Sequence, residues 1–163
     1  MKKITFLALL SVLTLSSIAQ NKFGHINAEE IMSLMPETKK AQIELESFQK
    51  GLEAQLSSLN IEFESKYTDY MNIESSLDDL TKQDKEAEIK NLQQRMQNFQ
   101  QNAQQSIQAK QNELLIPIND KLKNAIKEVA SEGKYTYIFT IEIFLYAEES
   151  NDIGSLVKAK LGL

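Results

Sequence analysis

The chain has 163 residues, 42% of them hydrophobic, and its 18 basic and 23 acidic residues give a formal net charge of −5. This hydrophobic content argues against a disordered protein, and the length fits one domain. The negative charge argues against nucleic acid as a partner, because binding phosphates requires basic side chains. The chain has no cysteine, so packing and assembly must stabilise it without disulfides.

The first residues have the features of a secretory signal peptide. A Met-Lys-Lys start precedes an uncharged apolar run over residues 4–15, and small residues follow it. This pattern predicts cleavage between Ala19 and Gln20, with residues 1–19 as the signal peptide and the periplasm as the destination. An uncleaved anchor is the alternative, but the run is too short to span a membrane, so we expect no stable membrane insertion after cleavage.

Removal of the signal peptide makes the chain more acidic. Two lysines leave with it, so the mature chain has 16 basic and 23 acidic residues, a net charge of 16 − 23 = −7. That charge also argues against docking on an anionic membrane surface.

Residues 37–116 are predicted to form a long helical hairpin, an arm with its tip near residues 78–84. Between Pro36 and Pro117 there is one glycine and no proline. Apolar residues recur at alternating spacings of three and four in both halves, as in a coiled coil. The two seams include Ala41, Leu45, Phe48, Leu52, Phe63, Tyr70, Ile73, Leu77 and Leu80, then Ile89, Leu92, Met96, Phe99, Ala103 and Ile107.

The polar break between the seams predicts two antiparallel helices of similar length, residues 37–80 and 84–129. Thr81 or Asp84 is expected to cap the second helix. One continuous rod is the disfavoured alternative. We expect Pro117 to kink the returning helix, because proline removes a backbone donor.

Residues 20–36 and 117–163 are predicted to form a small β body. "FGHIN" (23–27) is a strand candidate, and "YTYIF" (135–139) with "IFLYA" (143–147) is a hairpin candidate. The connection 140–142, Thr-Ile-Glu, suits a tight turn poorly, so the turn is displaced or residues 135–147 form one long strand.

The helices predicted in the body have residues at their ends that are typical helix caps. Asn27 with Glu30 is a capping-box candidate, and Gly133 is expected to end the long helix. Asn151 or Asp152 is expected to cap a last short helix that Gly162 closes.

So small a sheet cannot form a stable core alone, and its open edges invite other chains. We therefore expect an obligate oligomer. The residues proposed for the oligomer interface of the body are Phe23, Ile26, Tyr135, Tyr137, Phe139, Phe144, Leu145 and Tyr146. The fold class predicted is α+β, mainly helical.

The order of these segments resembles the Skp/OmpH family of periplasmic chaperones. The resemblance is carried by "GHINAEEIMSLMPETKKAQIELESFQKGLEAQL", "LQQRMQNFQQNAQQSIQAKQNELLIPI", "IKEVASEGKYTYIF" and "LYAEESNDIGSLVKAKLG". It implies a homotrimer, in which the β bodies complete a barrel and helical arms surround a cavity that holds unfolded outer-membrane proteins without ATP. Well-studied members are basic, so neither capture of clients by positive charge nor a lipopolysaccharide site carries over to this acidic chain.

Catalytic or metal chemistry is not indicated. His25 is the only histidine and has no partner at a motif spacing, so we expect an ordinary strand residue. The acidic residues at the predicted tip, Asp78, Asp79, Asp84, Glu86 and Glu88, lack the spacing of a calcium loop and are expected to be solvated. The chain is therefore expected not to be an enzyme and to need no cofactor or metal.

The polar arm surface is the candidate for contact with clients. Tyr67 lies one position off the seam, and Gln97, Gln101, Gln104 and Gln108 lie in a stretch rich in glutamine. Many weak contacts suit a holdase, which must release its client without an energy source. The hypothesis is a holdase for unfolded outer-membrane proteins. The alternative is a structural or adaptor coiled-coil protein of the cell envelope.

Overall fold

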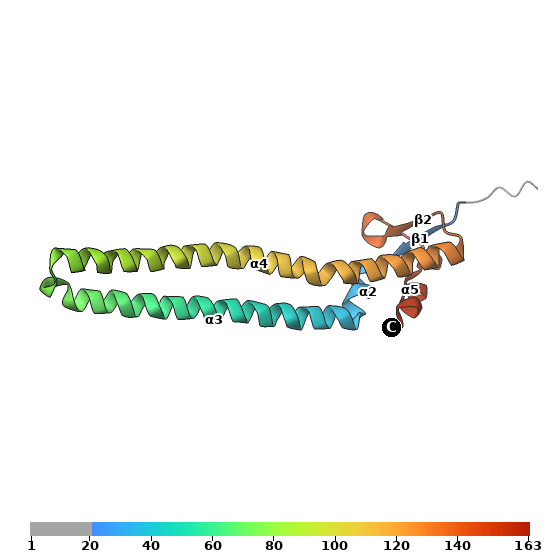
Figure 1. The fold of residues 1–163 in the computed structure, drawn as a ribbon. Helices are drawn as coiled ribbons and strands as arrows, with labels where there is room; N and C mark the ends of the chain where they lie inside the picture. Colours follow the sequence, from blue (N-terminus) through green and yellow to red (C-terminus); the bar gives the residue numbers. More distant parts are fainter. Residues whose placement is uncertain (1–20) are drawn as a thin grey trace, which may run out of the picture. The chain divides into compact units, whose positions relative to one another are not determined.

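The computed structural model describes residues 21–163, so the predicted signal peptide and its cleavage site lie outside the described residues. The chain divides into two compact units. We call the described residues up to Ile31 together with Leu122–Leu163 the body unit, and Met32–Lys121 the hairpin unit. Two long helices dominate the fold (Figure 1).

The sheet of the body unit has two parallel strands. β1 (Phe23–Ile26) pairs with β2 (Tyr137–Thr140), with Phe23 opposite Tyr137 and Ile26 opposite Thr140. Parallel strands require a long crossover, and here the crossover contains the three helices between the strands. Within residues 21–163 no further strand joins the sheet, so the outer edge of β2 is open, while Asp152 forms an isolated parallel bridge with His25 on the outer edge of β1.

Alternation along the strands gives the sheet two different faces. Gly24 and Ile26 point to one side, where Ile26 is almost fully buried. Phe23, Tyr137 and Phe139 point to the other side, where their rings remain partly exposed. The buried side belongs to the core of the body unit, which contains Ile26, Ile31, Leu122, Ala125, Val129, Ile153 and Val157.

The start of α2 and the end of α5 agree with the sequence prediction, but the start of α5 does not. The Asn27 side chain accepts a hydrogen bond of 2.9 Å from the Glu30 N–H and so caps α2 (Ala28–Leu34). The cap residue of α5 (Gly154–Leu161) is Ile153, and not Asn151 or Asp152. Asp152 lies one residue before it and accepts a hydrogen bond of 2.7 Å from the Gly154 N–H. Gly162 closes α5 with a φ of 75°, in the left-handed region that favours glycine.

The predicted β-hairpin is absent from the described chain. Residues 141–143 form a 3₁₀ turn, closed by a hydrogen bond of 3.1 Å from the Phe144 N–H to the Ile141 carbonyl. Residues 143–147 are not a strand, and residues 135–147 do not form one long strand. The physical reason is the connection itself, since Thr140 and Ile141 are β-branched and resist the positive φ of a two-residue hairpin turn.

α4 (Asp79–Gly133) ends at the predicted glycine, but for a different reason than expected. The left-handed residue is Lys134, with a φ of 53°, and not Gly133. The Tyr135 N–H bonds back to the Ala130 carbonyl at 2.9 Å, as in a Schellman motif. A side chain at Gly133 would overlap the Tyr135 ring, so this glycine is needed for close approach.

The hairpin unit pairs α3 (Pro36–Ile73) with the first part of α4, side by side and antiparallel (Figure 1). Pro36 occupies the first turn of α3, where its missing N–H costs nothing. Pro117 lies inside α4, which continues through it. At 1.5 Å per residue α3 is about 57 Å long.

The turn between α3 and α4 corrects the predicted boundaries. α3 ends at Ile73, a 3₁₀ turn follows (Glu74–Ser76), and α4 begins at Asp79. The cap is Asp78, and not Thr81 or Asp84. Its carboxylate accepts hydrogen bonds from the Thr81 N–H at 2.9 Å and the Thr81 hydroxyl at 2.7 Å. Asp78 is the cap because its carboxylate lies three residues before Thr81, whose N–H has no partner within the helix.

The predicted seams hold except near the turn. Ala41, Tyr70, Ile89 and Leu92 are buried, and most other seam residues are half-buried, as expected for two helices that shield only one stripe of each other. Ile73 and Leu80 are exposed, at 41% and 70%, because the helices already end there. Their predicted seam positions are therefore wrong.

Gly51 in α3 and Gly133 at the end of α4 give a matched pair of tests. A Cβ at Gly51 meets nothing within 4 Å, so Gly51→Ala should raise stability by about 0.5–1 kcal/mol. Gly133→Ala should lower it by about 1–3 kcal/mol, because the methyl group collides with the Tyr135 ring. Thermal unfolding followed by circular dichroism measures both. Equal effects of the two substitutions would contradict the assignment of Gly133 to close approach.

Candidate interaction surfaces

An exposed cluster of aromatic rings covers one face of the sheet in the body unit. We call Phe23, Tyr137, Phe139 and Phe144 the aromatic face. Phe23 stacks on Tyr137 with ring centroids 5.9 Å apart, and Tyr137 stacks on Phe139 at 6.1 Å. Phe144 meets Phe139 edge-on at 5.5 Å. The rings pack in the offset and edge-on arrangements that aromatic pairs prefer. Phe23 nevertheless remains 48% exposed to solvent, and Tyr137 remains 57% exposed.

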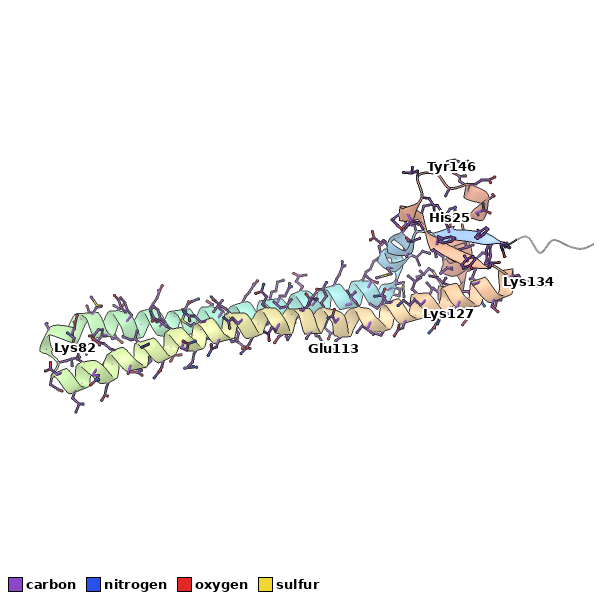
Figure 2. The ribbon with its side chains drawn as sticks, turned by 90° about the horizontal axis from the view of Figure 1, so that it is seen from above. His25, Lys82, Glu113, Lys127, Lys134 and Tyr146 are labelled. Carbon is purple, nitrogen blue, oxygen red and sulfur yellow. The ribbon has the colours of Figure 1, made fainter. Side chains whose placement is uncertain are left out.

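The segment after the 3₁₀ turn extends this apolar surface. Leu145 is fully exposed and Tyr146 is 82% exposed. Figure 2 shows the labelled Tyr146 at the outside of this segment. A groove of about 340 Å³ lies beside it, lined by Phe23, His25, Phe139, Phe144 and Tyr146 among others. So much exposed apolar side chain in one place marks an interaction surface.

His25 holds this segment in place and is an ordinary strand residue in the sense predicted. It is 92% buried, and its Nε2 lies 3.0 Å from the Glu148 carbonyl oxygen. Its ring also contacts the edge of Phe144, with centroids 6.4 Å apart. The backbone of β1 also pairs with the segment before α5, because the His25 carbonyl accepts a hydrogen bond of 3.0 Å from the Ile153 N–H.

The residues predicted for the body interface fall into two groups. Phe23, Tyr137, Phe139 and Phe144 come together in the aromatic face, and Leu145 and Tyr146 follow them. Ile26 lies instead in the core, 3% exposed. Tyr135 lies at the end of α4, where the Lys22 ammonium sits 4.0 Å above its ring. Their role in assembly stays a prediction.

Ion pairs link α4 to α3 and to the 3₁₀ turn that follows α3. From α3, Glu37 pairs with Lys121, Glu44 with Lys110 at 2.7 Å and Lys66 with Glu88 at 2.5 Å. From the turn, Glu74 pairs with Lys82 at 2.5 Å. The α4 partner moves back from 121 to 82 as the other partner advances from 37 to 74, so the pairs mark the antiparallel register. Figure 2 shows the labelled Lys82 at the turn. Exposed ion pairs contribute little to the free energy of folding. Their role here is to specify which residues of the two helices face each other.

The acidic residues at the tip are exposed to solvent, as predicted. Three of them, Asp78, Glu86 and Glu88, also accept hydrogen bonds from neighbouring side chains or backbone. Glu86 accepts one of 2.6 Å from the buried Tyr70 hydroxyl, and this bond raises the pKa of Tyr70. The Lys66 ammonium lowers the pKa of Glu88. The solvated carboxylates therefore also help to fix the two helices beside the turn.

The residues predicted to face a client lie on the surface of the hairpin unit. Tyr67 is 46% exposed and stacks on Phe63 at 5.9 Å. Gln97, Gln101, Gln104 and Gln108 are all exposed on α4. Their function stays a prediction, and exposure is the property that such contacts require.

Residues 21–163 contain neither a cluster of metal ligands nor a membrane-spanning helix. Within that part of the chain no three histidine or carboxylate side chains are grouped as a metal site would need. No helix among the same residues is long and apolar enough to cross a bilayer.

The fold defines a class of protein that combines a long antiparallel helical hairpin with a small β unit carrying an exposed aromatic face. The chain belongs to the OmpH-like outer membrane protein family, whose model matches residues 22–161. A crystal structure from Caulobacter crescentus CB15, provisionally described as an OmpH-like outer membrane chaperone, is similar in fold. The TM-score is 0.78 at 15% identity, covering 88% of this chain and 85% of the other. No curated protein matched the chain.

Sequence reasoning did not find the interhelical ion pairs or the Tyr70–Glu86 hydrogen bond. A signal for them exists once the turn is fixed at residues 74–78, because antiparallel pairing then determines which positions face each other. The charge balance of the two predicted helices points in this direction without naming partners, because residues 37–80 have 4 basic and 10 acidic residues and residues 84–131 have 7 basic and 6 acidic ones.

The ion pairs predict how the hairpin responds to pH. The lysines paired with Glu37 and Glu88 hold the pKa of these carboxyls below the usual 4.5, so their contribution is present above pH 4.5 and is lost as pH falls through the lower folded value. Lys66, Lys82 and Lys110 have a pKa above 10.5, so their contribution is lost as pH rises through the higher folded value. The midpoint temperature of thermal unfolding should be constant between these two pH limits, and it should decrease at pH values below the lower limit or above the higher one. A midpoint that rises below pH 4 would contradict this assignment.

Proposed function

We propose that the protein is a periplasmic holdase chaperone that works without ATP. In this proposal three copies join through their body units, and the hairpins enclose a cavity for unfolded outer-membrane β-barrel proteins. The observation that carries the proposal is the aromatic face beside a sheet that is open at the outer edge of β2. Membership of the OmpH-like family supports it.

Assembly follows from the cost of leaving this surface in water. Burying a large apolar side chain stabilises by about 1.5–3 kcal/mol, and Phe23, Tyr137, Leu145 and Tyr146 are all largely exposed in the single chain. Open strand edges also carry unpaired backbone donors and acceptors. A second and third copy would cover both, which supports a closed homo-oligomer over a monomer.

The hairpin has the properties that a holdase needs. Its outer surface is mostly polar, with isolated exposed apolar residues such as Ile43, Ile61 and Tyr67. Such a surface makes many weak contacts with an unfolded chain and does not trap it. The sequence contains no Gly-rich phosphate-binding loop, in keeping with release that needs no nucleotide.

Assembly through the aromatic face and the adjoining Leu145 is tested by Leu145→Asp. A carboxylate at this fully exposed position should prevent assembly, because burying an unpaired charge is costly. Sedimentation velocity should show loss of the oligomer. Leu80→Asp is the matched control, since Leu80 is 70% exposed at the turn between α3 and α4, and its oligomer should persist. An intact oligomer with Leu145→Asp would contradict the proposed interface.

Chaperone activity is tested by dilution of a urea-unfolded outer-membrane β-barrel protein into buffer without nucleotide. We expect an equimolar amount of the proposed trimer to suppress light scattering. Aggregation at the rate seen without the protein would reject the holdase proposal. A pull-down that yields one folded partner, and not many unfolded ones, would favour a structural or adaptor protein of the envelope instead.

A further inference from the structure

The outward face of α4 carries an unbroken row of carboxamides. Gln94, Asn98, Gln101, Gln105, Gln108 and Asn112 alternate spacings of four and three, and all are exposed. We call these six residues the amide face. Its first four members each lie two residues beyond a seam residue, about 200° around the helix, so the face points away from α3. Gln97 and Gln104 are exposed between its members.

The composition of this face is local and not a property of the whole helix. Residues 96–109 contain no charged side chain, whereas eight of the seventeen residues 79–95 are charged. The exposed face of a helix that only meets water normally mixes charged with other polar residues, as residues 79–95 do. The absence of charge over about four turns of an exposed face indicates a surface suited to contact with something other than solvent.

The chemistry of the amide face limits its partner. A second helix would need apolar residues to pack against, and nucleic acid or an anionic membrane would need basic ones. A carboxamide has both a donor and an acceptor, as a peptide group has. Gln94 and Asn98 already pair in this way, with a hydrogen bond of 3.0 Å from Nε2 to Oδ1. The partner that fits is a chain with unpaired backbone N–H and C=O groups.

The length of the face fits the same partner. Residues 94–112 span about 27 Å of helix. An extended chain of eight residues at about 3.3 Å each has that length, which is close to one strand of a membrane-spanning β-barrel. Since the face is neutral, it neither attracts nor repels a segment by the sign of its charge.

We propose that the amide face binds extended segments of unfolded polypeptide through their backbone groups, independently of their charge. This inference rests on the proposed function and specifies how the hairpin recognises its client. It assigns to uncharged carboxamides the contact that a basic arm would make by electrostatic attraction. Binding should therefore be insensitive to salt, because no counterions are released.

The test compares two triple variants of the full mature protein. Gln101→Ala, Gln105→Ala and Gln108→Ala together remove three carboxamides from the amide face, and alanine keeps the helix intact. Ser57→Ala, Asn60→Ala and Ser65→Ala together form the matched control on α3, where all three positions are exposed and uncharged. The probe is a urea-unfolded outer-membrane β-barrel protein, titrated by fluorescence at 50 and 500 mM NaCl.

We expect the amide variant to raise Kd roughly five-fold with unchanged helical content, and the control to stay within about two-fold of the wild type. The wild-type Kd should change less than about two-fold between the two salt concentrations. Equal Kd values for the amide variant and the control, or a wild-type Kd that rises ten-fold with salt, would overturn this inference and leave the holdase proposal standing. A wild type that binds no client at either salt would overturn both.

Discussion

The parallel pairing of β1 with β2 is the constraint on which the body unit depends. It joins two short strands that lie more than 100 residues apart in the chain, and it is the whole sheet within residues 21–163. One face of that sheet is buried in the core of the unit. The other face displays Phe23, Tyr137 and Phe139, stacked on one another and open to water. The body unit therefore has a well-defined surface that is apolar and incomplete.

The hairpin unit obeys a different constraint. Two helices paired along one seam leave most of each helix in water, so its core is narrow and its surface can vary without loss of the fold. Register is specified by the seam together with ion pairs such as Glu44–Lys110 and Lys66–Glu88. This arrangement leaves the outward surface free for function, and in α4 that surface is uncharged between Arg95 and Lys110.

Features that depend on local sequence could be predicted well. Heptad spacing gave the hairpin, and Asn27, Pro36 and Gly162 occupy the helix ends that their chemistry indicates. Features that depend on competition between neighbouring residues could not be predicted from the sequence. Asp78 and Thr81 are both good caps, and the choice between them depends on where α3 ends. Gly133 is required by the ring of Tyr135, a contact that exists only after the chain has turned back on itself.

The segment 143–147 shows why a single sequence gives an incomplete picture of such a body. Its residues have high β propensity and predict a strand, but propensity acts only where a partner strand is present. Within the described chain Leu145 and Tyr146 have no such partner and remain exposed. Their sequence is suited to a surface that other copies would complete.

A single chain leaves its aromatic face exposed, and we expect copies of the chain to cover it. This expectation is best tested by the mass of the mature wild-type protein, measured by light scattering after size-exclusion chromatography with and without an unfolded outer-membrane protein. We expect the mass of three chains for the protein alone, and of three chains plus one client in the mixture. A folded protein with the mass of one chain would show that the aromatic face needs no partner copy.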